Sequence, residues 1–171
     1  LLAVMSAVTE FGRALTRPLG APAGRLEAYV EVPFVVGDRK LFPDGLIRVT
    51  RGQRSWTALV EVKTGENVLV PEQIESYLDI ARDQGFDAVI TISNEIPPVA
   101  GQHPTTVDRR KLRRVALHHL SWTKVLSEAV MQKEYRGVAD PDQAWILGEL
   151  IRYLEHPRSG AMEFSDMGEH W

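Results

Sequence analysis

SWTALVEVK (residues 55–63) and FDAVITIS (residues 86–93) are the two stretches that decide the fold of this chain. Both are rich in β-branched and apolar residues, and the second is the clearest pattern of a buried strand in the sequence. The segment between them predicts a helix that begins at Pro71 and ends at Gly85. A strand, a helix and a strand in series favour a parallel crossover within one sheet.

Upstream, the sequence predicts one helix and two further strands. A helix over residues 2–16 follows from apolar residues that recur at helical spacing: Val4, Val8, Phe11 and Leu15. A strand over 25–36 follows from alternating apolar residues, which would share one side: Val30, Val32, Phe34 and Val36. The next strand, 41–50, is interrupted by Pro43-Asp44-Gly45. With 55–63, these strands are expected to form an antiparallel meander.

Downstream of residue 93, a strand is predicted over 113–122, a helix over 123–135 and a last helix from Asp140 to Pro157. The whole order predicts an α/β fold with a mixed β-sheet and helices on both faces. Residues 1–138 are expected to form one domain, and residues 139–171 a C-terminal helical extension or the start of a further region. Trp122 and Trp145 are expected in the core.

The composition bounds the class of protein. The chain has 171 residues, a formal net charge of -3, 44% hydrophobic and 25% charged residues, which are typical of one soluble globular domain. The absence of cysteine excludes disulfides and thiolate metal sites and fits a reducing, cytoplasmic location. No apolar run is long enough to span a membrane, so no membrane partner is expected. Both ends look cut, which suggests a fragment of a longer protein.

Two charged residues interrupt the apolar strand 55–63. Side chains alternate along a strand, so Glu61 and Lys63 point to one face, and Val60 and Val62 to the other. Asp44 lies at the bend in the preceding strand. If the two strands form a hairpin centred at about residue 52, Asp44 and Glu61 lie at the same level and side by side.

Two adjacent carboxylates repel unless a cation lies between them. Mg²⁺ resolves this repulsion, because it takes oxygen ligands and is often bound by one or two carboxylates with water and phosphate. A neighbouring lysine can hold an attacking water or neutralise charge on a phosphate. The three residue types therefore indicate metal-assisted phosphodiester hydrolysis. The alternative is an ordinary surface Glu–Lys pair, worth less than about 1 kcal/mol.

The spacing of these residues resembles a known signature. Pro43-Asp44, sixteen residues, and then Glu61-Val62-Lys63 resembles the PD-(D/E)xK nuclease superfamily. QIESY (residues 73–77) is similar to the QxxxY motif of its RecB-like branch, on the helix that follows the catalytic strand. The resemblance covers about residues 2–135 and implies a restriction-endonuclease-like fold with an αβββαβ core, followed here by a further strand and C-terminal helices.

The resemblance also implies roles for the matching residues. Asp44, Glu61 and the backbone carbonyl of Val62 would bind Mg²⁺ or Mn²⁺. Lys63 would position or activate the water, and Gln73 and Tyr77 would orient the substrate and the lysine. Many members of the family add an acid from the first helix. Three residues remain open for that position: Glu10, Glu27 and Glu31.

A basic run, DRRKLRR (108–114), is the candidate surface for a nucleic acid. It is expected to contact a phosphate backbone, with a solvated loop as the alternative; its basic residues are Arg109, Arg110, Lys111, Arg113 and Arg114. The expected function is a metal-dependent nuclease acting on DNA, with RNA as an alternative substrate. A homodimer or additional domains of a longer chain stay open. The alternative function is a catalytically inactive nuclease-like domain that binds nucleic acid or regulates a larger protein.

His118 and His119 are adjacent in the predicted strand 113–122. On a strand they would face opposite sides of the sheet, so a metal site that uses both is not expected.

Overall fold

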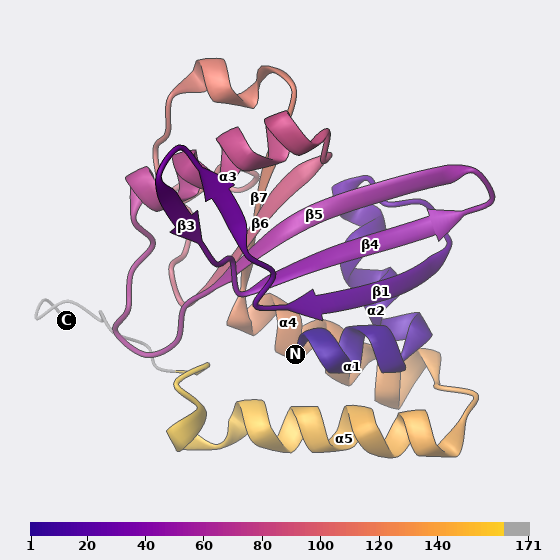
Figure 1. Cartoon of the computed structure of the whole chain (residues 1–171). Coiled ribbons are helices and arrows are strands. Elements are labelled where there is room, and N and C mark those ends of the chain that lie inside the picture. The colour runs from indigo at the N-terminus through magenta and orange to yellow at the C-terminus, as the bar shows by residue number, and fades with distance from the viewer. Residues whose placement is uncertain (163–171) are drawn as a thin grey trace, which may run out of the picture.

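A five-stranded mixed β-sheet forms the centre of the protein (Figure 1). The structure, a computed structural model, describes residues 1–162. The sheet has the order β1–β4–β5–β6–β7, with β1, β4 and β5 antiparallel and β5, β6 and β7 parallel. The strands are β1 (Arg25–Val30), β4 (Gly45–Arg51), β5 (Arg54–Val62), β6 (Ala88–Ser93) and β7 (Ala116–Ser121). The prediction of an α/β fold with a mixed sheet is confirmed.

The crossover between β5 and β6 runs through helix α3 (Pro71–Gln84). Pro71 lies in the first turn, where its missing N–H costs no hydrogen bond. Gly85 ends the helix in the left-handed conformation, with φ of 71°, which a glycine adopts without steric cost. The predicted strand–helix–strand crossover is therefore confirmed, and α3 covers one face of the sheet (Figure 1).

The other face is covered by the remaining long helices. Figure 1 shows α1, α2, α4 and α5 on the side of the sheet opposite α3. These helices are α1 (Leu2–Ala7), α2 (Thr9–Thr16), α4 (Trp122–Val130) and α5 (Pro141–Glu155). Shorter elements are η1 (Arg17–Leu19), η2 (Arg109–Arg113), η4 (Pro157–Ser159) and a π-helical turn, η3 (Met131–Arg136), that continues α4. Among residues 1–162, no helix is long and apolar enough to cross a membrane.

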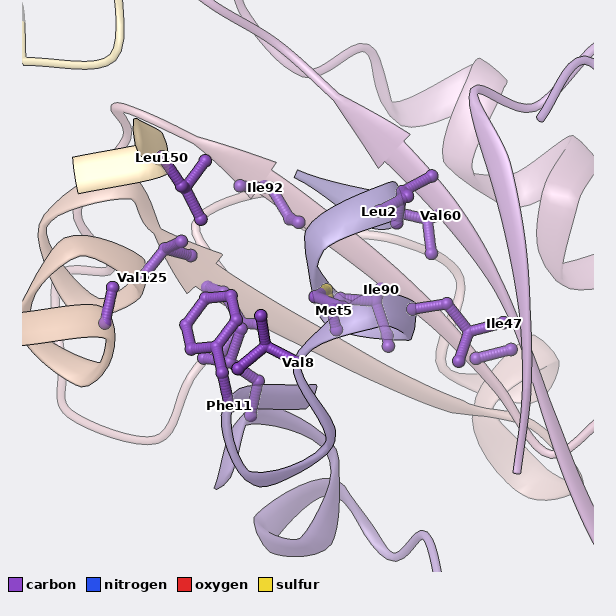
Figure 2. Close-up of a cluster of buried hydrophobic side chains, with 14 of the residues drawn as sticks. Leu2, Met5, Val8, Phe11, Ile47, Val60, Ile90, Ile92, Val125 and Leu150 are labelled. Atoms are coloured by element: carbon purple, nitrogen blue, oxygen red, sulfur yellow. The ribbon is translucent and has the colours of Figure 1, made fainter. Parts of the chain in front are cut away.

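Alternation along the strands gives each face of the sheet its own core. Val60 points into the larger core, which lies under the four helices, and its neighbour Leu59 points into the smaller core, which lies under α3. Figure 2 shows the larger core, where side chains of α1 and α2 meet those of the strands and of α4 and α5. The labelled residues are Leu2, Met5, Val8, Phe11, Ile47, Val60, Ile90, Ile92, Val125 and Leu150.

The predicted helix 2–16 is wrong in one respect, because it is two helices. Val8 is extended, with φ of -106° and ψ of 93°, and separates α1 from α2. At Gly12 a Cβ atom would overlap the carbonyl oxygen of Met5, so a glycine permits the close approach of the two helices. The predicted apolar stripe still reaches the core, because Val8, Phe11 and Leu15 are all buried.

The predicted strand 25–36 is also wrong in its extent. Its backbone turns at Glu31, which has a φ of 53°. The chain then forms a separate hairpin of β2 (Phe34–Val36) and β3 (Arg39–Leu41), which is inserted between β1 and β4. The expected meander is therefore interrupted, although β1, β4 and β5 pair as antiparallel neighbours.

Two smaller expectations fail as well. The start of the predicted strand 113–122 is not strand: η2 ends at Arg113, and β7 begins only at Ala116. Trp145 is 65% exposed on α5, whereas Trp122 is buried as expected.

Candidate active site

The site begins with two carboxylates at the open end of the β4–β5 hairpin. The register pairs Gly45 with Val60, so the next residues outward, Asp44 and Glu61, lie at the same level and point to the face of α3. The backbone N–H of Val62 donates to Asp44 Oδ2 over 2.7 Å, which holds the Asp44 side chain against the end of β5. Asp44 is exposed and Glu61 is only 3% exposed, so the pair spans the boundary between solvent and core.

Lys63 supplies the positive charge beside the buried carboxylate. Its Nζ lies 2.7 Å from Glu61 Oε1, and its side chain is 22% exposed. Burial raises the pKa of Glu61, and the negative charge of Asp44 raises it further, while the hydrogen bond and charge of Lys63 oppose both. Glu61 is thus a carboxylate whose charge is costly in this position, and a cation next to it lowers that cost.

Helix α3 brings two more of the expected residues to Glu61. Gln73 Nε2 donates to the Tyr77 hydroxyl over 3.1 Å. Burial and then the charge of Glu61 raise the pKa of Tyr77, so its phenol stays protonated and can donate. A hydrogen bond from this hydroxyl lowers the pKa of Glu61. Tyr77 is 2% exposed, and its ring is part of the core beneath α3.

The backbone of Lys63 is fixed on both sides. Its N–H donates to the carbonyl of Ile92 over 2.8 Å, which continues the parallel ladder past the last residue of β5. Its carbonyl accepts the indole N–H of Trp122 over 2.8 Å. The sequence predicts Trp122 as a core residue, with stacking on a nucleic-acid base as the alternative. Its polar edge, however, holds the chain at the point from which Lys63 reaches Glu61.

A polar row continues from Glu61 across the parallel strands. Glu61 is paired with Thr91 of β6, and Thr91 is paired with His119 of β7, so all three side chains lie on one face. Thr91 is fully buried. Thr91 is not among the site residues that the sequence predicts, although a hydroxyl residue between two isoleucines in the most apolar strand is a visible signal.

The three candidates for an additional acid lie on different segments: Glu10 on α2, Glu27 on β1 and Glu31 just after β1. Glu10 is on α2, where one carboxylate oxygen is buried without a hydrogen-bond partner among the described residues. Glu27 lies opposite Arg48 in the β1–β4 register, and its Oε1 lies 3.4 Å from the guanidinium of Arg25. Glu31 is exposed and follows Val30, whose partner is Gly45, so its backbone lies at the level of Asp44. Within residues 1–162, no three His, Cys, Asp or Glu side chains come together as a metal-binding group.

The basic run lies at the other end of β7. Ala116, two residues after Arg114, pairs with Ala88, whereas Glu61 is level with His119. At about 3.3 Å per residue, the strand start lies roughly 10 Å from the row of Glu61. Arg110 is bound to Asp108, and Lys111 to Asp79 of α3, over 2.8 and 2.6 Å. The remaining members of the run are exposed: Arg109, Arg113 and Arg114.

A cavity of about 500 Å³ borders the exposed carboxylate. It is lined by Asp44, Val62 and Thr64 and by apolar side chains that include Val30, Trp122 and Leu154. Of the two carboxylates, Asp44 lines this hollow and Glu61 does not, and the hollow lies on the side of α1 and α5.

No family of known proteins matches the sequence, and no curated protein matches it at a significant level. The function of the chain is therefore inferred from the geometry of the site.

Proposed function

We propose that the chain is a metal-dependent nuclease that hydrolyses phosphodiester bonds, with DNA as its substrate. One observation carries the proposal. Asp44 and Glu61 oppose each other across the β4–β5 hairpin at the edge of the sheet, and Lys63 Nζ lies 2.7 Å from Glu61. The order of a helix, antiparallel strands, a helix and a parallel strand supports a restriction-endonuclease-like fold.

The residues present fit a hard divalent cation such as Mg²⁺ or Mn²⁺. Asp44 offers an exposed carboxylate, and Glu61 offers a carboxylate whose pKa is raised mainly by burial, so a cation beside it would stabilise its charged form. The Val62 carbonyl is the third expected oxygen ligand. Mg²⁺ usually keeps several waters and needs only one or two carboxylates from the protein, so this donor set is sufficient. When bound, the ion would polarise the phosphate and the attacking water and stabilise the leaving oxygen.

Each protein residue then has a defined task. The Lys63 ammonium, which pairs with Glu61, would hold the attacking water against the phosphate. Tyr77 donates to Glu61, and Gln73 donates to Tyr77. The Gln73 side chain is partly exposed, so it can contact the substrate. Trp122 fixes the Lys63 backbone, which limits where the ammonium can move.

Cleavage of linear double-stranded, circular and single-stranded DNA with Mg²⁺ or Mn²⁺ tests the proposal. Asp44→Asn and Lys63→Ala should each reduce cleavage by about 100-fold or more, as loss of a charge-stabilising group does in other enzymes. Glu134→Gln and Lys133→Ala are matched controls, because they form a Glu–Lys pair of the same 2.7 Å length on a more exposed part of the surface. The controls should keep full activity.

Two outcomes would contradict a nuclease. Cleavage that survives in both site variants would come from a contaminant. An absence of cleavage, together with a melting temperature that Mg²⁺ and Mn²⁺ leave unchanged, would show that the proposed residues do not bind a metal ion. Metal binding without cleavage would favour the alternative of an inactive nuclease-like module that binds nucleic acid.

A further inference from the structure

A hollow lined by three arginines lies at the end of the sheet opposite the carboxylate pair. This arginine hollow has a volume of about 790 Å³ and takes its charge from Arg17, Arg51 and Arg54. Arg54 begins β5, seven residues before Glu61, so the hollow lies roughly 23 Å from the carboxylates at 3.3 Å per residue. Figure 1 shows the β4–β5 turn projecting away from the β2–β3 hairpin.

The arginine hollow also lies on the other face of the sheet. Arg51 is two residues after Val49 on β4, and Arg54 is two residues before Trp56 on β5. Val49 and Trp56 both point into the larger core, so the two arginines lie on the face covered by α2. Glu61 points to the opposite face, which α3 covers. The hollow is therefore separate from the candidate active site.

Positive charge in the hollow is not balanced by the protein. Arg51 and Arg54 lie directly opposite each other beside a two-residue turn, where like charges repel. Among residues 1–162, none of the three guanidinium groups lies within 4.0 Å of a carboxylate. Asp87 also lines the hollow, but its Oδ2 accepts the backbone N–H of Thr57 over 2.8 Å. The whole chain has a net charge of -3, so this excess of positive charge is local.

The walls of the hollow are fixed by the fold. One wall is segment 20–23, in which Ala21 is buried and donates its N–H to the carbonyl of Thr16 over 3.2 Å. At Gly24 a Cβ atom would overlap the carbonyl oxygen of Thr50, so the chain packs closely against the end of β4. The two-residue turn fixes the register of Arg51 and Arg54 on the other side. The hollow thus exists before any ligand binds, as most small-molecule sites do.

We propose that the arginine hollow binds a small ligand that carries two or more adjacent phosphate groups, such as the diphosphate of a nucleotide. A guanidinium group donates two parallel hydrogen bonds to a phosphate, and a phosphate between Arg51 and Arg54 would replace their repulsion by attraction. Arg17 would contact the neighbouring phosphate. A volume of about 790 Å³ is typical of small-molecule sites. This site does not depend on the proposed nuclease activity.

A small ligand fits the hollow better than a nucleic-acid backbone does. The phosphates of a diphosphate share one oxygen, so several negative charges enter one concave space. Along a nucleic-acid strand, sugars separate single phosphates, and each phosphate carries one charge. Three guanidinium groups that line one hollow match the more concentrated charge.

Calorimetric titration of the full chain with pyrophosphate tests the proposal, in about 0.15 M salt to screen weak surface attraction. EDTA is present, so that the carboxylate pair cannot hold the probe through a metal ion. Pyrophosphate should bind at least about 10-fold more tightly than inorganic phosphate. Arg17→Gln, Arg51→Gln and Arg54→Gln should each weaken binding by about 10-fold or more, as the loss of a charged hydrogen bond does.

Arg158→Gln is the matched control, because it removes one positive charge from an exposed position at the other end of β5. Its neighbour Gly160 accepts the backbone N–H of Gly65, three residues after β5 ends. This variant should bind pyrophosphate as the wild type does. An absence of pyrophosphate binding, or equal weakening in Arg158→Gln, would overturn the proposal. A single-stranded oligonucleotide that binds more tightly than pyrophosphate, and that the same arginine variants weaken, would assign the hollow to a nucleic-acid backbone instead.

Backbone NMR of the wild type gives a second test that does not require the variants to fold. Pyrophosphate should shift the amide signals of Ala21, Gly52 and Arg54 and leave those of Val62 and Lys63 unchanged. Shifts at Val62 and Lys63 alone would place the phosphate at the carboxylate pair and would overturn the arginine hollow as a binding site.

Discussion

Lys63 compensates a buried carboxylate, so its removal should have a larger effect on stability than the loss of an exposed lysine. Glu61 keeps its raised pKa even with the ammonium 2.7 Å away. In Lys63→Ala the carboxylate would lose its nearest positive charge, and its pKa would rise further. We expect the free energy of unfolding to fall by about 2 kcal/mol at pH 7.5, somewhat less than for a fully buried pair because Lys63 is partly exposed.

The pH dependence identifies the cause of this loss. An acid with a raised pKa in the folded state binds its proton more readily when folded, so the penalty is absent at low pH and appears as pH rises through the folded pKa. The loss in Lys63→Ala should therefore shrink at pH 5, and adding Glu61→Gln should restore most of it at pH 7.5. Urea unfolding at both pH values measures this. An equal loss at both pH values would mean that Lys63 acts through packing alone.

For single residues, the sequence predicts neighbours within one hairpin and misses neighbours from segments that are distant along the chain. Asp44 and Glu61 can be placed at one level by counting outward from a single turn, because an antiparallel hairpin fixes its own register. Thr91 and His119 cannot be placed this way, because their parallel registers depend on how α3 and segment 94–108 pack. The bond from Trp122 to Lys63 spans 59 residues and has no signal in the sequence.

Among the elements, the junction of α1 and α2 depends on one glycine. Alanine favours a helix by about 1 kcal/mol over glycine, so helix propensity alone would make Gly12→Ala stabilising. The new Cβ would instead overlap the Met5 carbonyl oxygen, a backbone atom that can move only if the two helices separate. We expect Gly12→Ala to lower the free energy of unfolding by about 2 kcal/mol or more.

Gly148→Ala on α5 is the matched control for Gly12→Ala. Its Cβ would meet only the end of the flexible Lys133 side chain, which can move aside. This variant should be unchanged or more stable by up to about 1 kcal/mol. Thermal unfolding of both variants compares their stabilities. A Gly12→Ala protein as stable as Gly148→Ala would show that α1 and α2 can move apart without lowering the free energy of unfolding.

The contact of α4 with the end of β5 gives a second prediction for an element. Trp122→Phe keeps most of the buried ring and removes the N–H that bonds the Lys63 carbonyl. An unsatisfied carbonyl should cost about 1–2 kcal/mol of stability. Trp145→Phe, at a position that is 65% exposed, should cost less than about 0.5 kcal/mol. Equal losses by urea unfolding would indicate that water replaces the indole N–H.

The elements were predicted better than their ends. Periodicity correctly located the long helices and the central strands, because it records which residues are buried. It did not detect the break at Val8, since both helices keep their apolar residues toward one core. Nor did it detect the turn at Glu31, because apolar alternation continues through the inserted β2–β3 hairpin while the backbone changes direction.

For the molecule as a whole, acid should be destabilising well before the carboxylates titrate. The folded state lowers the pKa of His103, His118 and His119, mainly through burial. A lowered histidine pKa means that the unfolded chain binds more protons, so this stability is complete above about pH 6.5 and is lost as pH falls below it. Glu61 has the opposite sign, because its raised pKa favours the folded state as it takes up its proton.

Urea unfolding between pH 8 and 5 measures the combined effect of the three histidines and Glu61 on the free energy of unfolding. Each histidine contributes at most about 1.4 kcal/mol per pH unit, and less here because the imidazoles are only half-buried and partly screened by water. His118→Gln should remove about a third of the slope of the free energy of unfolding against pH. Constant stability from pH 8 to 5 would contradict neutral, buried imidazoles.

The β4–β5 hairpin has a consequence for how such sites diverge in sequence. The number of residues between Asp44 and Glu61 reflects only the length of the two strands and their turn, because the carboxylates meet at the open end. Lengthening each strand by one residue adds two residues between Asp44 and Glu61 and keeps these two residues opposite each other. Lengthening each strand by two residues adds four, and it also returns both side chains to the face of the sheet on which they lie here. Relatives that keep the two-residue turn between Arg51 and Arg54 should therefore differ in this gap by even numbers, and a search with one fixed spacing would overlook them.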